Sequence, residues 1–139
     1  DLEDEYFEPT IQYEILTNKT NTKVYKKMIQ QIQRKISSYK AQDKEKKIFD
    51  NEKFINMEIV LEKIEKCTMK CFYCTDHVKI LYKAVKDPKQ WSIERINNDY
   101  GHNSDNFEIA CLKCNLNRKT MYHERFLFTK QLNIVKNDI

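Results

Sequence analysis

Cys71-Phe-Tyr-Cys74 and Cys111-Leu-Lys-Cys114-Asn115 decide the fold of this chain, because they form two Cys-x2-Cys pairs separated by residues 75 to 110. Each pair makes a tight turn whose two thiolates point inward, so two such turns complete a tetrahedron of zinc ligands. Two disulfides are the alternative. An odd cysteine count of 5, a lysine-rich chain without a visible signal peptide, and this spacing all favour a metal. The sequence therefore predicts a zinc site at these four cysteines.

Two further residues near the first pair could bind a metal, and both have weaker support. Cys67 precedes the pair and His77 follows it. The Cys-x2-Cys geometry favours Cys71 and Cys74 over Cys67 as ligands, and His77, three residues after Cys74, has similarly weak support. We therefore expect both to lie outside the zinc site.

The residues between and after the two pairs predict a strand, a loop, a second strand and a helix. Residues 91 to 96 and 107 to 110 are rich in β-branched and aromatic residues, and residues 112 to 119 read as a helix that starts inside the second pair. In the first strand, Ser92, Glu94 and Ile96 share one face. The loop holds Gly101, the only glycine, where we expect a backbone angle that other residues resist.

This order of motifs resembles the HNH endonucleases, the ββα-metal or His-Me finger family, in their four-cysteine zinc-bearing form. That family has a strand ending in Asp-His, an Asn in the following loop, and an Asn after the last cysteine with a basic residue beyond it. The corresponding residues here are Glu94-Arg95, Asn106, Asn115 and Arg118-Lys119. The amino-acid sequence from Trp91 to His102 is similar to that of HNH proteins of phages and of large DNA viruses of protists. This looser resemblance runs from about Lys35 to Lys136.

The resemblance implies an α+β fold, a ββα-metal core stapled by zinc, with helices at both ends. It also implies an endonuclease, a hydrolase acting on DNA phosphodiester bonds with magnesium or another divalent cation. By position, Glu94 and Asn115 would bind magnesium, since their oxygens are suitable hard ligands. Asn106 would hold the loop by hydrogen bonds to backbone. Four thiolates leave no open position on the zinc, so its role would be structural.

One departure from the family pattern concerns the general base. The family has His where this chain has Arg95, and arginine stays protonated at physiological pH. Arg95 could instead clamp a phosphate oxygen or stabilise charge in the transition state. Our hypothesis is that His102, in the same loop, acts as base or as an extra metal ligand. The alternative is a loop histidine that only forms local hydrogen bonds.

Basic residues at two places predict contacts with DNA. Arg118 and Lys119 follow Asn115 on the same helix and would face the phosphate backbone. Arg34 and Lys35 lie on the basic face of a helix predicted over residues 23 to 47. An ordinary solvated helix face is the alternative there. No recognition helix of a known type is visible, so we expect weak sequence specificity.

The remaining segments predict further elements around this core. Asn56 is expected to cap a helix that ends near residue 66. Residues 121 to 136 are expected to form a final helix. Residues 78 to 84 read as a strand. Residues 10 to 16 could form a short strand, but we favour a surface segment or a piece of an upstream domain for residues 1 to 22. We predict two parts: an acidic segment with a helical arm over 1–66, and a zinc-stapled domain with its C-terminal helix over 67–139.

Composition limits the class of protein further. The 139 residues are 40% hydrophobic and 33% charged, which allows one modest core that zinc would help to stabilise. The formal net charge is +4, although the first 22 residues are acidic, so the remainder is more basic than the total suggests. No apolar run is long enough for a membrane span. We expect a reducing intracellular compartment, the host cytoplasm or nucleus if the protein is viral. The first residue is Asp, which suggests a piece of a longer protein.

Two other functions compete with the nuclease. The first is a catalytically decayed HNH-like zinc module that binds nucleic acid or a protein partner, and Arg95 favours it. The second is a plain zinc-stapled interaction domain in a larger assembly. Retention of Glu94, His102, Asn106 and Asn115 together favours the nuclease, because a structural zinc module needs none of them.

Overall fold

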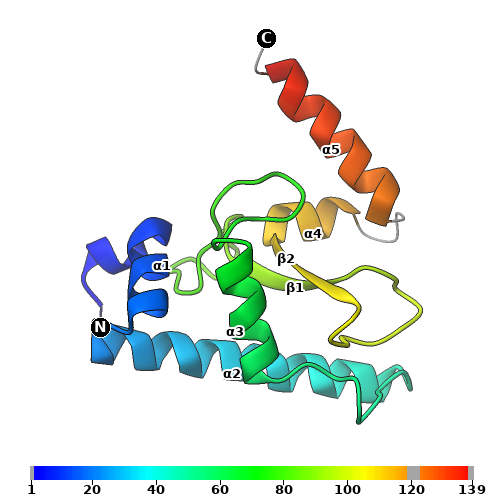
Figure 1. Cartoon of the computed structure of the whole chain (residues 1–139), viewed down its shortest axis with the longest axis horizontal. Helices are drawn as coiled ribbons and strands as arrows, with labels where there is room; N and C mark the ends of the chain where they lie inside the picture. The colour runs from blue at the N-terminus through cyan, green and yellow to red at the C-terminus, as the bar shows by residue number, and fades with distance from the viewer. Residues whose placement is uncertain (1, 119–122, 138–139) are drawn as a thin grey trace.

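A β-hairpin lies at the centre of the computed structural model, which describes residues 2–118 and 123–137 (Figure 1). The strands β1 (Trp91–Arg95) and β2 (Phe107–Cys111) form an antiparallel sheet, and α4 (Leu112–Arg118) follows β2 without a gap. The other elements, in chain order, are the 3-10 helix η1 (Asp4–Phe7), α1 (Pro9–Asn18), α2 (Thr22–Glu45), α3 (Met57–Lys66) and α5 (His123–Asn137). The predicted α+β class and the predicted hairpin with its following helix are confirmed.

The register of the hairpin sets which side chains share a face. Trp91 pairs with Cys111 and Arg95 pairs with Phe107, so Ser92 and Glu94 lie on the same face of β1. The helix α4 contacts both strands. The hairpin therefore carries one face bearing Ser92 and Glu94 beside the helix that carries Asn115.

The open edge of β1 is covered by side chains of α2. The hydroxyl of Tyr39 accepts a hydrogen bond from the backbone N–H of Ile93 at 3.2 Å, and Nζ of Lys35 donates to the carbonyl of Trp91. An uncovered strand edge exposes unpaired backbone groups, so these two contacts complete the small sheet. They also fix α2 against the strand that carries the candidate site.

The long helix α2 forms as its sequence predicts. Asn21 caps it by accepting a hydrogen bond from the backbone N–H of Val24 at 3.2 Å. Its buried residues recur at helical spacing: Val24, Met28, Ile32, Ile36 and Asp43. Four of these are apolar, and the fifth, Asp43, is a carboxylate at the same spacing. The predicted cap of α3 is also confirmed, since Asn56 accepts from the N–H of Ile59 at 2.9 Å.

The strand predicted over residues 78 to 84 is wrong, and residues 10 to 16, which could have formed a short strand, are helical. Residues 10 to 16 lie in α1, where Pro9 starts the helix and Gln12, Ile15 and Leu16 are buried at helical spacing. Residues 78 to 84 form only one isolated bridge, between Lys79 and Gln90.

A side chain replaces the missing strand partner in the second segment. The Gln12 amide is fully buried, and its Oε1 accepts from the N–H groups of Ile80 at 2.8 Å and Leu81 at 3.0 Å. Its Nε2 donates to the carbonyls of Leu81 at 2.8 Å and Tyr6 at 2.9 Å. The segment is therefore held in place without a sheet.

One buried cluster joins most of the described chain. It runs from Ile15 in α1 to Phe126 in α5, and it includes residues on both sides of the predicted boundary at residue 66. The division of the chain into two parts stays a prediction.

The last helix is attached at its beginning and leads away from the hairpin (Figure 1). The ring of Phe126 packs edge-on against Tyr73, with centroids 4.8 Å apart. Farther along α5, Phe128 and Leu132 are exposed. The predicted final helix is thus present, and it is anchored chiefly beside the first cysteine pair. Among the described residues, no helix has the length and apolar character needed to cross a membrane.

Candidate metal centre and oxygen-bearing face

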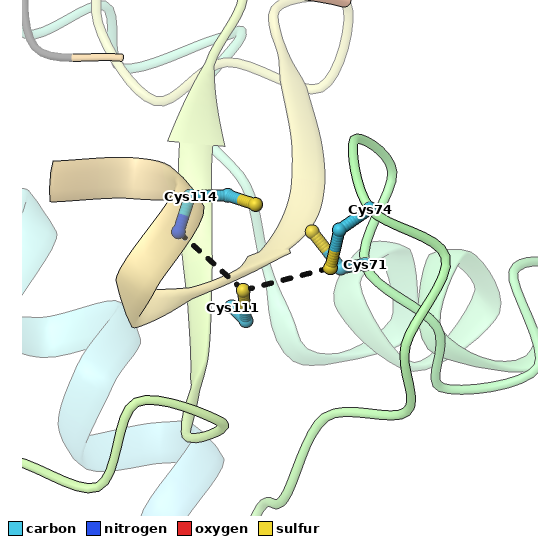
Figure 2. Close-up of side chains that lie close together, drawn as sticks. All are labelled: Cys71, Cys74, Cys111 and Cys114. Carbon is cyan, nitrogen blue, oxygen red and sulfur yellow. Dashed lines mark hydrogen bonds between the residues drawn. The ribbon is translucent and has the colours of Figure 1, made fainter. Parts of the chain in front are cut away.

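The two Cys-x2-Cys pairs converge on one point (Figure 2). The sulfurs of Cys71, Cys74, Cys111 and Cys114 all lie within 4.8 Å of one another. A tetrahedral zinc ion with Zn–S bonds of about 2.3 Å places its sulfurs about 3.8 Å apart. The sulfurs of Cys74 and Cys111 are 3.9 Å apart, which matches this geometry. The four side chains fit a structural zinc ion.

Backbone contacts explain why the two turns meet. The N–H of Cys71 donates to the carbonyl of Asp76 at 2.8 Å, which closes the first turn. The N–H of Phe72 donates to the carbonyl of Ile109 at 2.8 Å, which attaches that turn to β2. The N–H of Cys114 points to Sγ of Cys111 at 3.4 Å, as expected where a helix starts over a thiolate. Local turns and one cross-contact therefore build the site.

The close packing of the sulfurs favours their ionised forms at the first pair. Hydrogen bonding from the Cys111 thiol, then from Cys114, lowers the pKa of Cys74 to about 6. The same two neighbours lower the pKa of Cys71. The hydrogen bond with Cys111 raises the pKa of Cys114, and the pKa of Cys111 is raised as well. Metal binding requires thiolates, so a cation would displace the protons held by the second pair. Cys67 and His77 lie outside the four-residue cluster, as expected.

A second set of polar groups lies where β1 meets α4. The amide Nδ2 of Asn115 donates to Oγ of Ser92 at 3.1 Å, and that hydroxyl donates to the carbonyl of Ala110 at 2.9 Å. The contact uses the nitrogen of the amide, so Oδ1 of Asn115 is the atom left to bind a cation. Ser92 thereby orients Asn115 on the face of β1 that also carries Glu94.

Glu94 is a buried carboxylate with only one of its oxygens paired. Its Oε1 lies 3.2 Å from the guanidinium of Arg118, and the carboxylate is shielded from solvent. Its Oε2 is buried and has no hydrogen-bond partner among the described residues. Burial raises the pKa of Glu94 to about 7, although Arg118 and Arg95 oppose that rise.

Arg118 lies inside the protein with internal partners. Its side chain is 1% exposed, and it donates to the carbonyls of Arg95 and, at 2.6 Å, Ile96. The predicted contact of Arg118 with a phosphate stays a prediction, and it would require these bonds to open. Lys119, the other basic residue predicted beside it, lies outside the described residues.

The loop between the strands is closed by Asn106, in the way the sequence predicts. Its Nδ2 donates to the carbonyls of Asn97 at 3.0 Å and Gly101 at 2.9 Å, and its Oδ1 accepts from the N–H of Asn97 at 2.8 Å. Arg95 braces the same loop, because its guanidinium donates to the carbonyls of Asn98 at 3.0 Å and Tyr100 at 3.2 Å. The loop is thus held from both of its ends.

His102 is joined to a carboxylate that lies far away in the sequence. Its Nδ1 lies 2.7 Å from Oδ1 of Asp43, and its backbone N–H donates to Oδ2 of Asp43, also at 2.7 Å. Asp43 is fully buried, His102 is 5% exposed, and the ring of Tyr39 stacks 4.3 Å from the imidazole. The hydrogen-bond partner of His102 is thus not local in sequence, and its role as base or metal ligand stays a prediction.

Burial also sets the protonation state of His102. It lowers the pKa of the imidazole, and the hydrogen bond to Asp43 only partly opposes this. In the neutral ring, Nδ1 must carry the proton, because an ionised carboxylate can only accept. Nε2 then carries the lone pair, and it is not among the buried atoms that lack a partner in the described residues.

Gly101 is required by a close approach rather than by an unusual backbone angle. No glycine in the described chain has a positive φ, so the predicted reason is wrong. A Cβ at this position would lie 2.5 Å from Oδ2 of Asp43 and 2.9 Å from the carbonyl oxygen of Ile48. Glycine is needed there because the loop passes directly against the end of α2.

Arg34 and Lys35 are neighbours in α2 with different surroundings. Arg34 is exposed, as a phosphate contact requires. Lys35 is folded against the hairpin, with Nζ 4.8 Å from the centre of the Trp91 ring, and burial lowers its pKa to about 8. DNA binding by either residue stays a prediction.

The sequence analysis missed Asp43, Ser92 and the pairing of Glu94 with Arg118. One signal for Asp43 was present, since it continues the buried stripe of α2 beyond Ile36 and Tyr39. A charged residue on an apolar stripe indicates a buried partner. No comparable signal in the sequence connects Glu94 with Arg118.

Comparison of the chain with protein-family models, with curated proteins and with solved structures finds no match. The geometry itself defines the class of this chain as an α+β protein with a four-cysteine metal site on a ββα-like unit.

Proposed function

We propose that this chain is a metal-dependent endonuclease that hydrolyses phosphodiester bonds of DNA. The observation that carries the proposal is Oε2 of Glu94, a buried carboxylate oxygen without a partner among the described residues. A buried, unpartnered carboxylate is costly unless a proton or a cation satisfies it. The buried guanidinium of Arg118 accounts for one oxygen of this carboxylate, Oε1, and leaves Oε2 for another partner.

Two oxygen donors on β1 and α4 support magnesium as the proposed ion. Glu94 offers a carboxylate oxygen, and Asn115 offers an amide oxygen that its contact with Ser92 leaves available. Magnesium usually takes one or two carboxylates from the protein, and it keeps water and phosphate oxygens as its other ligands. Oε2 of Glu94 and Oδ1 of Asn115 would therefore hold the ion. When bound, magnesium polarises the phosphoryl group and stabilises the leaving oxygen.

Among the residues that the sequence analysis proposed for catalysis, His102 is chemically the best suited to accept a proton from water. The hydrogen bond of Nδ1 to Asp43 fixes the ring and its tautomer, so Nε2 is the basic atom. Its lowered pKa keeps the imidazole neutral near pH 7, which a general base requires. Arg95 cannot take this role, and its guanidinium instead holds the loop that carries His102. The net charge of +4 suits an anionic polymer as substrate.

The test of this proposal is nicking of supercoiled plasmid DNA by the zinc-loaded chain with added magnesium. Asn115→Ala removes the proposed amide ligand, and we expect nicking to fall by about 100-fold or more. Asn117→Ala is the matched control, because it removes the same amide from an exposed position of α4. Equal activity of the two variants would contradict the assignment of Asn115, and absence of nicking by the unmodified chain would contradict the function.

The proposed base is tested separately from the metal. His102→Ala should lower the nicking rate by about 100-fold or more, since general bases contribute this much. Asp43→Asn keeps the shape of the partner but removes its charge, so it should lower the rate and shift its pH profile. Circular dichroism must confirm that both variants fold, because this pair is buried. A folded His102→Ala variant with unchanged nicking would remove His102 from the mechanism.

A specific observation supports a second candidate, a zinc module that binds DNA without cutting it. The guanidinium of Arg118 lies 3.2 Å from Glu94 and is almost fully buried, so a fixed positive charge neighbours the proposed magnesium. Two cations this close repel each other in a poorly solvated site. Salt-dependent DNA binding without magnesium-dependent nicking would select this candidate.

A further inference from the structure

A cleft whose lining includes none of the four cysteines is formed by three separate segments. Its volume is about 270 Å³, and its wall includes Lys27, Gln30 and Arg34 from α2. Phe7 at the end of η1 and Leu81 with Tyr82 from the segment held by Gln12 complete it. Arg34 is the one residue of this lining to which the sequence analysis gave a function, and the proposed nuclease site uses none of the lining residues.

The charges of the cleft are positive and unpaired. Lys27 and Arg34 form no ion pair with any residue that the structure describes, and no described acidic residue lines the cleft. A second cleft of about 300 Å³ between α1 and α3 contrasts with it, since Glu58, Glu62 and Glu65 line that one. Two uncompensated cations at the rim of a concave site favour an anionic ligand.

The two aromatic rings of the cleft are held in place by neighbours. The hydroxyl of Tyr82 accepts a hydrogen bond from Nε2 of Gln31 at 3.2 Å. Lys83 covers the ring of Phe7, with Nζ 5.2 Å from its centre, and pairs with Asp4. Gln12 fixes the backbone of Leu81 next to Tyr82. Rings positioned in this way can pack against a flat group with little loss of entropy on binding.

Positive side chains beside aromatic rings are the combination by which proteins hold single-stranded nucleic acid. The volume is smaller than the usual range of about 300–1,000 Å³ for drug-sized ligands, so the cleft suits one small unit rather than a helix. We propose that this cleft binds one nucleotide of a single DNA strand, with its phosphate at Lys27 and Arg34 and its base at Phe7 and Tyr82. The choice of DNA as the ligand rests on the proposed function. The proposal implies that the substrate of the nuclease contains a single-stranded segment.

The test is binding of a fluorescently labelled oligothymidine strand to the zinc-loaded chain, followed by anisotropy without magnesium. Lys27→Ala and Arg34→Ala should each weaken binding about threefold to tenfold, and each should lower the slope of log affinity against log salt by about 0.7. Lys26→Ala is the matched control, because it removes an equal charge from the same helix outside the cleft. Equal effects of Lys26→Ala and Lys27→Ala would overturn the proposal.

The aromatic part of the cleft is tested with two variants at one position. Tyr82→Ala should weaken strand binding about fivefold or more, since stacking on one aromatic ring contributes this much. Tyr82→Phe keeps the ring and should bind as the unmodified chain does, and thermal melting confirms that both variants are folded. Equal loss in both variants would overturn stacking on Tyr82.

Competitors identify the ligand chemistry, and the readout is independent of cleavage. Thymidine monophosphate should displace the strand at concentrations where inorganic phosphate does not, and duplex DNA should show no difference between Lys26→Ala and Lys27→Ala. Displacement by phosphate alone, or by an acidic peptide when the strand itself does not bind, would overturn the proposal. A chain that binds the strand through Lys27 but never nicks plasmid DNA would refute the nuclease and leave this cleft assigned.

Discussion

The four-cysteine site and the oxygen-bearing face of β1 differ in how their charges are arranged. At the first site, four sulfurs from two turns converge within 4.8 Å of one another, an arrangement that suits a metal ion. At the second, Glu94 already has the guanidinium of Arg118 at 3.2 Å on one oxygen, while the other oxygen has no described partner. The contrast teaches that the first site offers its ligands to a metal ion, whereas the carboxylate of the second already has one partner from the protein itself.

The largest expected effect comes from removing zinc from the first site. Cys111→Ser, or treatment with a strong chelator, should unfold the hairpin, since structural zinc contributes on the order of 10 kcal/mol in small domains. Circular dichroism during thermal melting is the measurement, with zinc content determined in the same samples. Cys67→Ser is the control, because Cys67 lies outside the cluster and should keep both zinc and stability. A chelated protein that melts as the zinc-loaded one does would erase the contrast between the sites.

A smaller effect is expected when the charge pair of the second site is broken. Arg118→Ala leaves the Glu94 carboxylate buried without its cation, which should cost about 3–5 kcal/mol of unfolding free energy. Glu94→Gln is the milder partner change, since a neutral amide of similar shape needs no counterion. Urea unfolding gives both values. If magnesium binds at Glu94, it should raise the melting temperature of Arg118→Ala but not of the double variant Glu94→Gln, Arg118→Ala.

The smallest effect concerns Lys35, a buried charge under the same hairpin that has no carboxylate partner. Burial lowers its pKa from 10.5 to about 8, so the folded chain holds this proton less tightly than the unfolded chain does. Its contribution to stability is therefore present above pH 10.5 and lost as the pH falls through 8. Lys35→Met should remove a gain of about 2–3 kcal/mol between pH 8 and 10.5.

Urea unfolding of the unmodified chain and of Lys35→Met at these two pH values checks that expectation. Lys40→Met is a suitable control, because Lys40 is an exposed residue of the same helix. Parallel stability-versus-pH profiles for all three proteins would show that burying Lys35 without a carboxylate partner costs no measurable stability. In that case the paired Arg118 and the unpaired Lys35 would not differ in the way we expect.

The sequence predicts the parts of this molecule that depend on near neighbours. The Asn56 cap and the loop contacts of Asn106 join groups less than ten residues apart, and the four-cysteine site is built from two short Cys-x2-Cys turns; each is visible in the structure. The hydrogen bond between Asp43 and His102 spans 59 residues and depends on how α2 packs against the loop. Local periodicity does not contain that information, which is why Asp43 and the true reason for Gly101 were found only in the structure.

The same limit explains the strand that did not form. Residues 78 to 84 have the β-branched and aromatic composition of a strand, but the partner they need is not another strand. Their backbone groups bond to Gln12, which lies 68 residues before Ile80. Composition reports the tendency of a segment, whereas its final form depends on which groups are brought beside it.

Gln12 has a consequence that extends beyond its own position. A primary amide has an acceptor oxygen and a donor nitrogen, as a peptide unit does, and its nitrogen carries two hydrogens. The buried side chain of Gln12 can therefore replace the hydrogen bonds of an adjacent strand. Glutamate has almost the same shape but, when ionised, only accepts, and it could not replace Gln12 without losing the two donated bonds to Tyr6 and Leu81. The shape of the cleft beside Tyr82 thus depends on the nitrogen of one side chain in the first helix.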